Sequence, residues 1–174
     1  MDKLTALSLS IGGIAGVATF FAVLPLTSGI FFIWAATIAW AAYFLLGANQ
    51  EAVINNITCG IFGVFMAWAT AIMLTEISPT TMLGFPFMAA FTVCAAVVVM
   101  CLAANIPPLA TIPSSVLGYS STFAYLLQTP DKLNKDVLLG FSMSNPLLVI
   151  SISFVVGTFC GVWSAQLSGK LTTK

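Results

Sequence analysis

The sequence contains no arginine and no histidine, and its only basic side chains are five lysines. Without a basic face, the chain lacks the charge that a nucleic acid partner would need. Without histidine, it lacks the side chain used most often as a general base, and a common metal ligand. No nucleophile–base pair and no set of metal ligands stands out. We therefore predict that the protein is not an enzyme and uses no cofactor.

Charge of either sign is scarce. Only 6% of the residues are charged, whereas about a quarter are charged in a typical soluble domain. Hydrophobic residues make up 60% of the chain, and the mean hydropathy is +1.09. Runs of about 20 apolar residues are long enough to cross the core of a bilayer. We therefore predict an all-α polytopic membrane protein that has the lipid bilayer as its solvent.

Five long apolar runs are candidates for transmembrane helices. They cover residues 4–24, 30–46, 53–74, 82–104 and 146–167. The first and last contain Gly-x-x-x-Gly patterns, which favour close packing of helices: Gly12 with Gly16, and Gly157 with Gly161. The four cysteines fall within these runs and form no Cys-x-x-Cys pair, so we interpret them as small apolar side chains.

A sixth segment, residues 105–127, begins with NIPPLATIPSS and is broken by three prolines. Proline removes a backbone donor and disfavours helix before it. The run that follows, 116–127, is too short and too polar to cross a bilayer. The segment is either a surface loop or a re-entrant half-helix capped by Ser114 and Ser115. We favour the re-entrant half-helix because its length fits, which makes the predicted fold five transmembrane helices plus one Pro-broken re-entrant half-helix.

Two stretches, GANQEAVINNITCGIFGVFMAWATA and IPPLATIPSSVLGYSSTFAYLL, lie on either side of a long apolar span. In this order they resemble a bacterial inner-membrane family catalogued as domain of unknown function 1097. The resemblance covers nearly the whole chain and includes Pro113, Gly118, Phe123 and the glycine pair near the C-terminus. It implies a multi-pass protein of the bacterial inner (cytoplasmic) membrane and no settled activity.

The proline-rich segment also resembles, more distantly, the Leu-Pro-x-x-Thr-x-Pro-Phe signature found in each half of urea transporters. Pro108, Thr111 and Pro113 match that signature, whereas Pro107 and Ser114 stand at its Leu and Phe positions. The resemblance implies one half-repeat of such a transporter, whose re-entrant helix lines a narrow slot. Aromatic rings clamp the solute there, and Tyr119 or Phe123 would have to supply the missing ring.

No charged residue lies deep inside a predicted span, and charges within the membrane mark ion and proton relays. We therefore expect a passive channel or facilitator for a small neutral polar solute of the urea or amide type. The alternative is a non-transporting membrane scaffold or accessory subunit that packs through its glycine faces. The candidate solute-path residues, led by Thr111, are Pro108, Pro113, Ser114, Ser115, Tyr119, Phe123, Asn55 and Asn56. For the two asparagines we weigh equally a structural role, in which they satisfy the backbone or each other near the interface.

A single half-repeat needs an inverted partner, so we expect a homo-oligomer in which protomers pair upside down. With five crossings, Lys3, Lys132 and Lys135 would lie on one side of the membrane, and Lys170 and Lys174 on the other. Three lysines against two give only a weak positive-inside bias. This near-even count is consistent with two orientations in the membrane.

Overall fold

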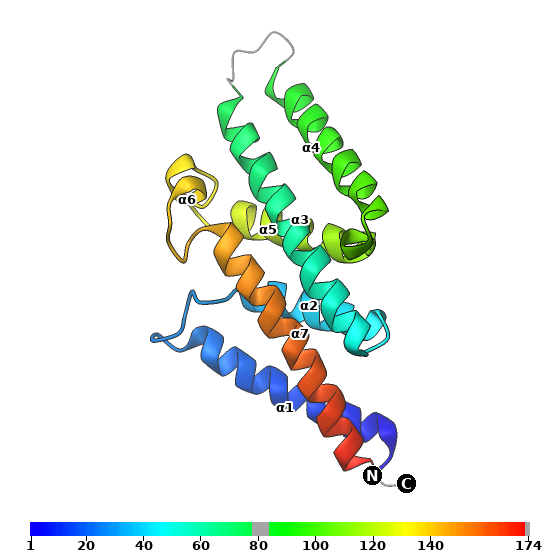
Figure 1. The fold of residues 1–174 in the computed structure, drawn as a ribbon. Coiled ribbons are helices and arrows are strands. Elements are labelled where there is room, and N and C mark those ends of the chain that lie inside the picture. The colour runs from blue at the N-terminus through cyan, green and yellow to red at the C-terminus, as the bar shows by residue number, and fades with distance from the viewer. Residues whose placement is uncertain (78–83, 173–174) are drawn as a thin grey trace.

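Helices make up the regular secondary structure of the computed structural model, which describes residues 1–77 and 84–172 (Figure 1). The all-α fold is therefore confirmed for the described residues. Lys174 and the first two residues of the predicted span 82–104 lie outside them. The elements in chain order are α1 Lys3–Val23, α2 Ile33–Leu45, α3 Gln50–Glu76, α4 Phe85–Leu102, the 3-10 turns Ala103–Asn105 and Pro107–Leu109, α5 Ile112–Gln128, α6 Lys135–Leu139 and α7 Pro146–Leu171.

Four of these helices are long and apolar enough to cross a membrane: α1, α3, α7, and α4 together with the 3-10 turn that follows it. A multi-pass membrane protein is what this pattern indicates. By contrast, α2 has 13 residues and α5 has 17, fewer than the about 20 that a straight crossing needs. The predicted count of five transmembrane helices plus one re-entrant half-helix is not confirmed.

Helix α5 begins earlier than the sequence suggested. Its first residue is Ile112, with Thr111 at the N-cap position and Pro113 in the first turn. Proline suits the first turn because the N–H that it lacks would have no partner inside the helix there. Ser114 and Ser115 therefore lie inside the helix and do not cap it, so the capping role predicted for them is wrong.

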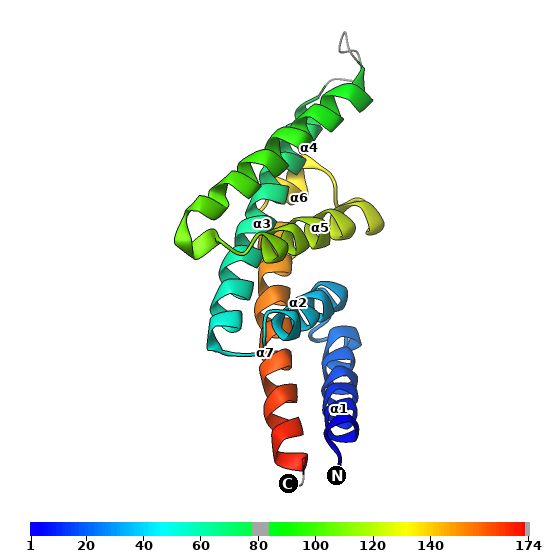
Figure 2. The same cartoon turned by 90° about the vertical axis from the view of Figure 1, so that its right-hand side faces the viewer.

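The chain contains two halves of similar plan that run in opposite directions. Each half has a long helix, a short helix and a second long helix: α1, α2 and α3, then α4, α5 and α7. In Figures 1 and 2 each helix of the first half runs opposite to its counterpart in the second. The two short helices lie side by side across α3 and α7 (Figure 2). The fold is therefore an internal inverted repeat, with α6 inserted before the last helix.

Equivalent close contacts hold the two halves together. A Cβ built on Gly63 of α3 would lie 1.9 Å from the carbonyl oxygen of Ser115 in α5. In the other half, a Cβ on Gly157 of α7 would lie 1.9 Å from the carbonyl oxygen of Ala36 in α2. Each short helix thus touches a long helix of the opposite half, backbone against backbone. Gly161 contributes to the second contact, since its Cβ would meet the rings of Tyr43 and Trp40.

The core lies where α3 and α7 cross. Phe154 is the largest fully buried side chain of the described residues, and its ring occupies the space beside Gly60. The glycine of α3 makes room for the aromatic ring of α7, so the two longest helices cross at close range. Dispersion contacts of this kind replace the hydrophobic effect as the source of helix association inside a membrane.

The two ends of the chain lie together (Figure 1). The N-terminal ammonium of Met1 donates a hydrogen bond to the carbonyl oxygen of Leu171, 3.3 Å away. Termini at one end of the molecule favour an even number of crossings, whereas the sequence predicts five full spans. Lys3 therefore lies at the same end of the molecule as the last turns of α7, whereas the sequence analysis grouped it with Lys132 and Lys135. Lys135, the first residue of α6, lies toward the end of the molecule opposite to the two termini (Figure 1).

Single-cysteine labelling tests this topology. On a background without the four native cysteines, we expect Lys3→Cys and Lys170→Cys to react with an impermeant maleimide from the same side of the membrane. We expect Lys135→Cys to react only from the other side, because the terminal residues and α6 lie at opposite ends. Reaction of the two terminal sites from opposite faces would contradict the even number of crossings. Labelling of every site from both faces would show the dual orientation predicted from the lysine count.

Candidate functional site

Asn56 lies at the point where α2, α3, α5 and α7 meet, and its side chain is 0% exposed. Its amide nitrogen donates to the carbonyl oxygen of Ala39 in α2, 2.7 Å away, and to Oγ1 of Thr158 in α7, 2.8 Å away. Its amide oxygen accepts a hydrogen bond of 3.3 Å from Oγ of Ser114 in α5. One neutral side chain therefore connects four helices from both halves of the repeat.

Small hydroxyl groups extend the Asn56 network along the face of α7 that meets α2. We call the network and these hydroxyls together the polar seam. Ser153 accepts a hydrogen bond of 2.7 Å from the backbone N–H of Phe32, at the start of α2. Ser164 accepts one of 3.0 Å from the indole N–H of Trp40. Both hydroxyls are buried. None of the buried side chains that the structure describes carries a charge, so the interior is polar but neutral.

Four buried hydroxyls have no hydrogen-bond partner among the described residues. Three belong to α5, namely Ser115, Tyr119 and Ser121, and the fourth is Ser151 of α7. The hydroxyl of Tyr119 lies near Thr70, whose own hydroxyl donates to the carbonyl oxygen of Met66 at 2.7 Å. Leaving a buried hydroxyl unpaired costs about 1–3 kcal/mol, so most such groups in proteins are paired. The α5 hydroxyls therefore mark a place where water or a polar solute would be stabilised.

The proline break packs against α3 but does not itself form the centre of the seam. The thiol of Cys59 donates to the carbonyl oxygen of Pro108 at 3.5 Å, which holds the break against that helix. Pro108 and Pro113 are exposed, and Thr111 is half-buried at the N-cap of α5. Thr111, the leading candidate from the sequence, thus lies at the edge of the polar seam.

The other predicted path residues lie in two places, near the Asn56 junction and in an apolar cluster beside α4. Ser114 and Asn56 are joined directly, whereas Asn55 is half-buried on a neighbouring face of α3. The rings of Tyr119 and Phe123 are in contact, with centroids 5.0 Å apart. They pack with Met100 of α4 in an apolar cluster between α3, α4 and α5. The two rings expected to replace the missing phenylalanine are therefore neighbours.

Sequence reasoning named the packing glycines of α7, Gly157 and Gly161, but missed its buried hydroxyls. Its buried small residues recur every three or four positions, which is one face of a helix. The pattern alone would have located the seam, because only serines and glycines stand at these positions: Ser153, Gly157, Gly161, Ser164 and Ser168.

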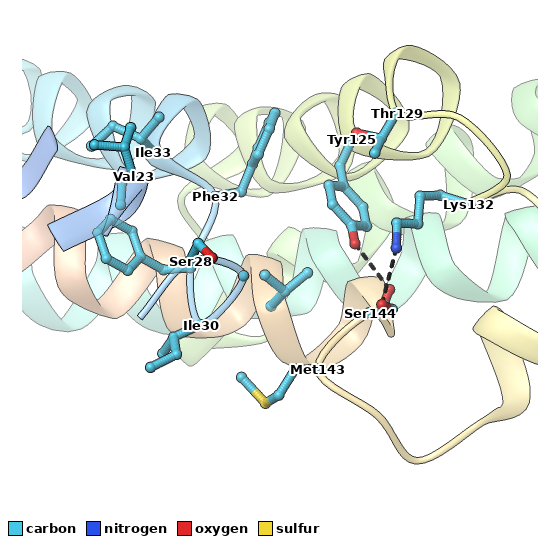
Figure 3. A pocket seen from close by; sticks show the side chains of 14 residues that line it. Val23, Ser28, Ile30, Phe32, Ile33, Tyr125, Thr129, Lys132, Met143 and Ser144 are labelled. Atoms are coloured by element: carbon cyan, nitrogen blue, oxygen red, sulfur yellow. Dashed lines mark hydrogen bonds between the residues drawn. The ribbon is translucent and has the colours of Figure 1, made fainter. Parts of the chain in front are cut away.

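A separate cavity of about 500 Å³ lies between the link from α1 to α2, the end of α5 and the start of α7 (Figure 3). At its polar end, the Lys132 ammonium donates to Oγ of Ser144 at 3.0 Å. The hydroxyl of Tyr125 donates to the carbonyl oxygen of Ser144 at 3.1 Å. None of the predicted path residues lines this cavity.

One family model, described as Protein of unknown function (DUF1097), matches residues 8–169. No curated protein and no solved structure matches the chain. The comparisons therefore do not show the likeness to urea transporters.

Proposed function

We propose that this chain, which belongs to the DUF1097 family, is a passive facilitator for a small neutral polar solute of the urea or amide type. We assign it to the bacterial inner membrane. The observation that carries the proposal is the set of unpartnered buried hydroxyls of α5, Ser115, Tyr119 and Ser121, on the helix whose Ser114 joins the Asn56 network.

A small amide carries both hydrogen-bond donors and an acceptor. Hydroxyl groups can supply either partner, because each both donates and accepts. Ser115 lies one residue from Ser114 and is 1% exposed. Tyr119 follows one helical turn later on the same face of α5. A solute that moves along this face would exchange hydrogen bonds with successive hydroxyls. Ions would be disfavoured, because no buried charge of the described residues replaces their hydration.

The inverted repeat supports this assignment. Transporters built from inverted repeats bind their solutes where interrupted helices meet between the halves. In this chain the proline break separates α4 from α5, and α5 meets the opposite half at Asn56. We propose that the proline break and α5 together form the re-entrant segment that the sequence predicts at residues 105–127. The sequence analysis expected an inverted pair of protomers because a single half-repeat needs an inverted partner. Since one chain contains both halves, that reason for an inverted pair no longer applies. The homo-oligomer stays a prediction.

Solute flux tests the proposal, with Tyr119→Phe as the key variant. We expect the wild-type protein in liposomes to accelerate the entry of urea or acetamide in stopped-flow swelling. Removing the Tyr119 hydroxyl should lower this flux by about fivefold, which corresponds to the loss of one hydrogen bond of about 1 kcal/mol. The stability of the variant should be unchanged or higher, because the hydroxyl has no partner among the described residues.

Tyr125→Phe is the matched control. It removes the same atom from the same helix, but this hydroxyl is bonded to Ser144. We expect a lower stability and an unchanged flux. If wild-type protein gives no acceleration over empty liposomes for urea, acetamide or glycerol, the facilitator is excluded.

The alternative function, a scaffold or accessory subunit, is favoured by one feature of α1. Nothing lies within 4 Å of a Cβ built on Gly12 or on Gly16, so this small-residue face has no neighbour among the described residues. The predicted packing of these glycines would then involve another molecule. A partner that co-purifies at a fixed ratio, together with an absence of flux, would support the scaffold.

A further inference from the structure

Lys132 is a cation without an acidic partner among the described residues. It is half-buried and lines the cavity of Figure 3, where its ammonium meets the neutral hydroxyl of Ser144. No carboxylate of the described residues lines this cavity. The ion pair in the described part of the chain joins the other lysine of this region, Lys135, to Glu76 at 2.6 Å. A half-buried ammonium that lacks a counter-charge favours a negatively charged ligand.

The rest of the cavity is mostly apolar. Most of its polar side chains gather at the end where Lys132, Ser144 and Tyr125 lie, and Ser28 lies apart from them (Figure 3). The remaining walls come largely from hydrophobic side chains: Val23, Ile30, Phe32, Met143 and Val149. A volume of about 500 Å³ is typical of a site for an organic ligand and far exceeds what a lone inorganic anion would fill. The shape therefore fits an amphiphile with an anionic head.

The cavity also lies at the ends of helices. It is bounded by the end of α1, the start of α2, the end of α5 and the start of α7. Two of these helices, α1 and α7, are long and apolar enough to cross a membrane, and the ends of crossing helices are expected at the depth of lipid headgroups. Basic pockets between such helices are a recurrent place for anionic headgroups.

We propose that this cavity binds the phosphate of an anionic phospholipid. Lys132 supplies the charge, and Ser144 donates to a phosphate oxygen. The apolar walls cover the first part of an acyl chain. The proposal is independent of the facilitator function, because the cavity contains none of the hydroxyls assigned to the solute path.

Lipid titration of the full chain in detergent, followed by native mass spectrometry, tests the site with phosphatidylglycerol as probe. We expect Lys132→Gln to weaken phosphatidylglycerol binding by about fivefold, the effect of one lysine near an anionic headgroup. Lys135→Gln is the control. It removes the same charge three residues away, where the side chain lies in an exposed ion pair, and should bind as the wild type does.

Two further arms make the test decisive. Met143→Glu adds a negative charge to the cavity from an exposed position and should also weaken binding, which keeps the test valid if Lys132→Gln fails to fold. Phosphatidylcholine and inorganic phosphate are compared on the wild type. Equal binding of phosphatidylcholine would overturn the proposal. Full displacement of the lipid by millimolar inorganic phosphate would show a site for a free anion and would also overturn it. Equal losses of phosphatidylglycerol binding in the Lys132→Gln and Lys135→Gln variants would also overturn the proposal.

Discussion

Alanine at Gly63 or at Gly157 is expected to destabilise the protein by about 3 kcal/mol, the upper range for overpacking. A Cβ at either position would lie 1.9 Å from a backbone carbonyl oxygen of the facing short helix. Backbone atoms cannot turn away as a flexible side chain can, so the helices themselves would have to separate. That separation would weaken the packing along the whole interface between a long and a short helix.

Gly12→Ala is the matched control, because it adds the same methyl group to a helical glycine of a Gly-x-x-x-Gly pattern. Nothing lies within 4 Å of the added atom, so the helix should gain about 1 kcal/mol from the better propensity of alanine. Unfolding of the purified proteins by titration with sodium dodecyl sulfate in mild detergent measures all three. Equal stabilities of the Gly63, Gly157 and Gly12 variants would show that the close contacts do not form.

The glycines show what a motif can and cannot predict. Gly157 and Gly161 share their spacing with Gly12 and Gly16, yet only the first pair meets another helix of the described chain. Small residues permit a close approach, but they do not determine which helix packs against them. Gly63 went unassigned because its partner, Ser115, lies on a segment that the sequence suggested was broken.

The long helices were predictable because hydrophobic length is a property of each segment alone. The apolar runs 4–24, 53–74 and 146–167 correspond to α1, α3 and α7. The inverted repeat was not predictable in this way. The link before α2 has one proline, Pro25, whereas the break before α5 has two, Pro107 and Pro108, so the two halves look unlike in sequence. Their equivalence lies in direction and packing, which only the folded chain displays.

The candidate site was partly predictable because some of its residues belong to a local sequence pattern. Ser114, Ser115 and Tyr119 were named from a local pattern, and all three are buried on α5. The sequence alone did not show which of Asn55 and Asn56 points into the core, because the buried face of α3 was not known. Cys59, Gly60 and Gly63 mark that face, and Asn56 lies on it, one helical turn before Gly60. Asn55 is rotated away by about 100° and is half-buried.

Asn56→Leu is expected to lower stability by about 2 kcal/mol, whereas Asn55→Leu should change it by less than about 0.5 kcal/mol. Hydrogen bonds between membrane helices contribute about 0.6 kcal/mol on average and at most about 1.7 kcal/mol each. Asn56 makes three of them, to three different helices. Leucine has a similar volume, so the loss would come mainly from the polar contacts and from the Ser114 hydroxyl left without its acceptor.

The same two variants separate a structural role from a role in the solute path. Detergent titration gives the stability of each variant, and swelling of liposomes in urea gives its flux. If Asn56 orients Ser114 and its neighbours on α5 toward the solute, the flux of Asn56→Leu should fall to the level of empty liposomes even where the variant remains folded by circular dichroism. Full flux in folded Asn56→Leu would restrict the asparagine to packing. The path would then have to run along the Tyr119 side of α5, away from the junction of the four helices.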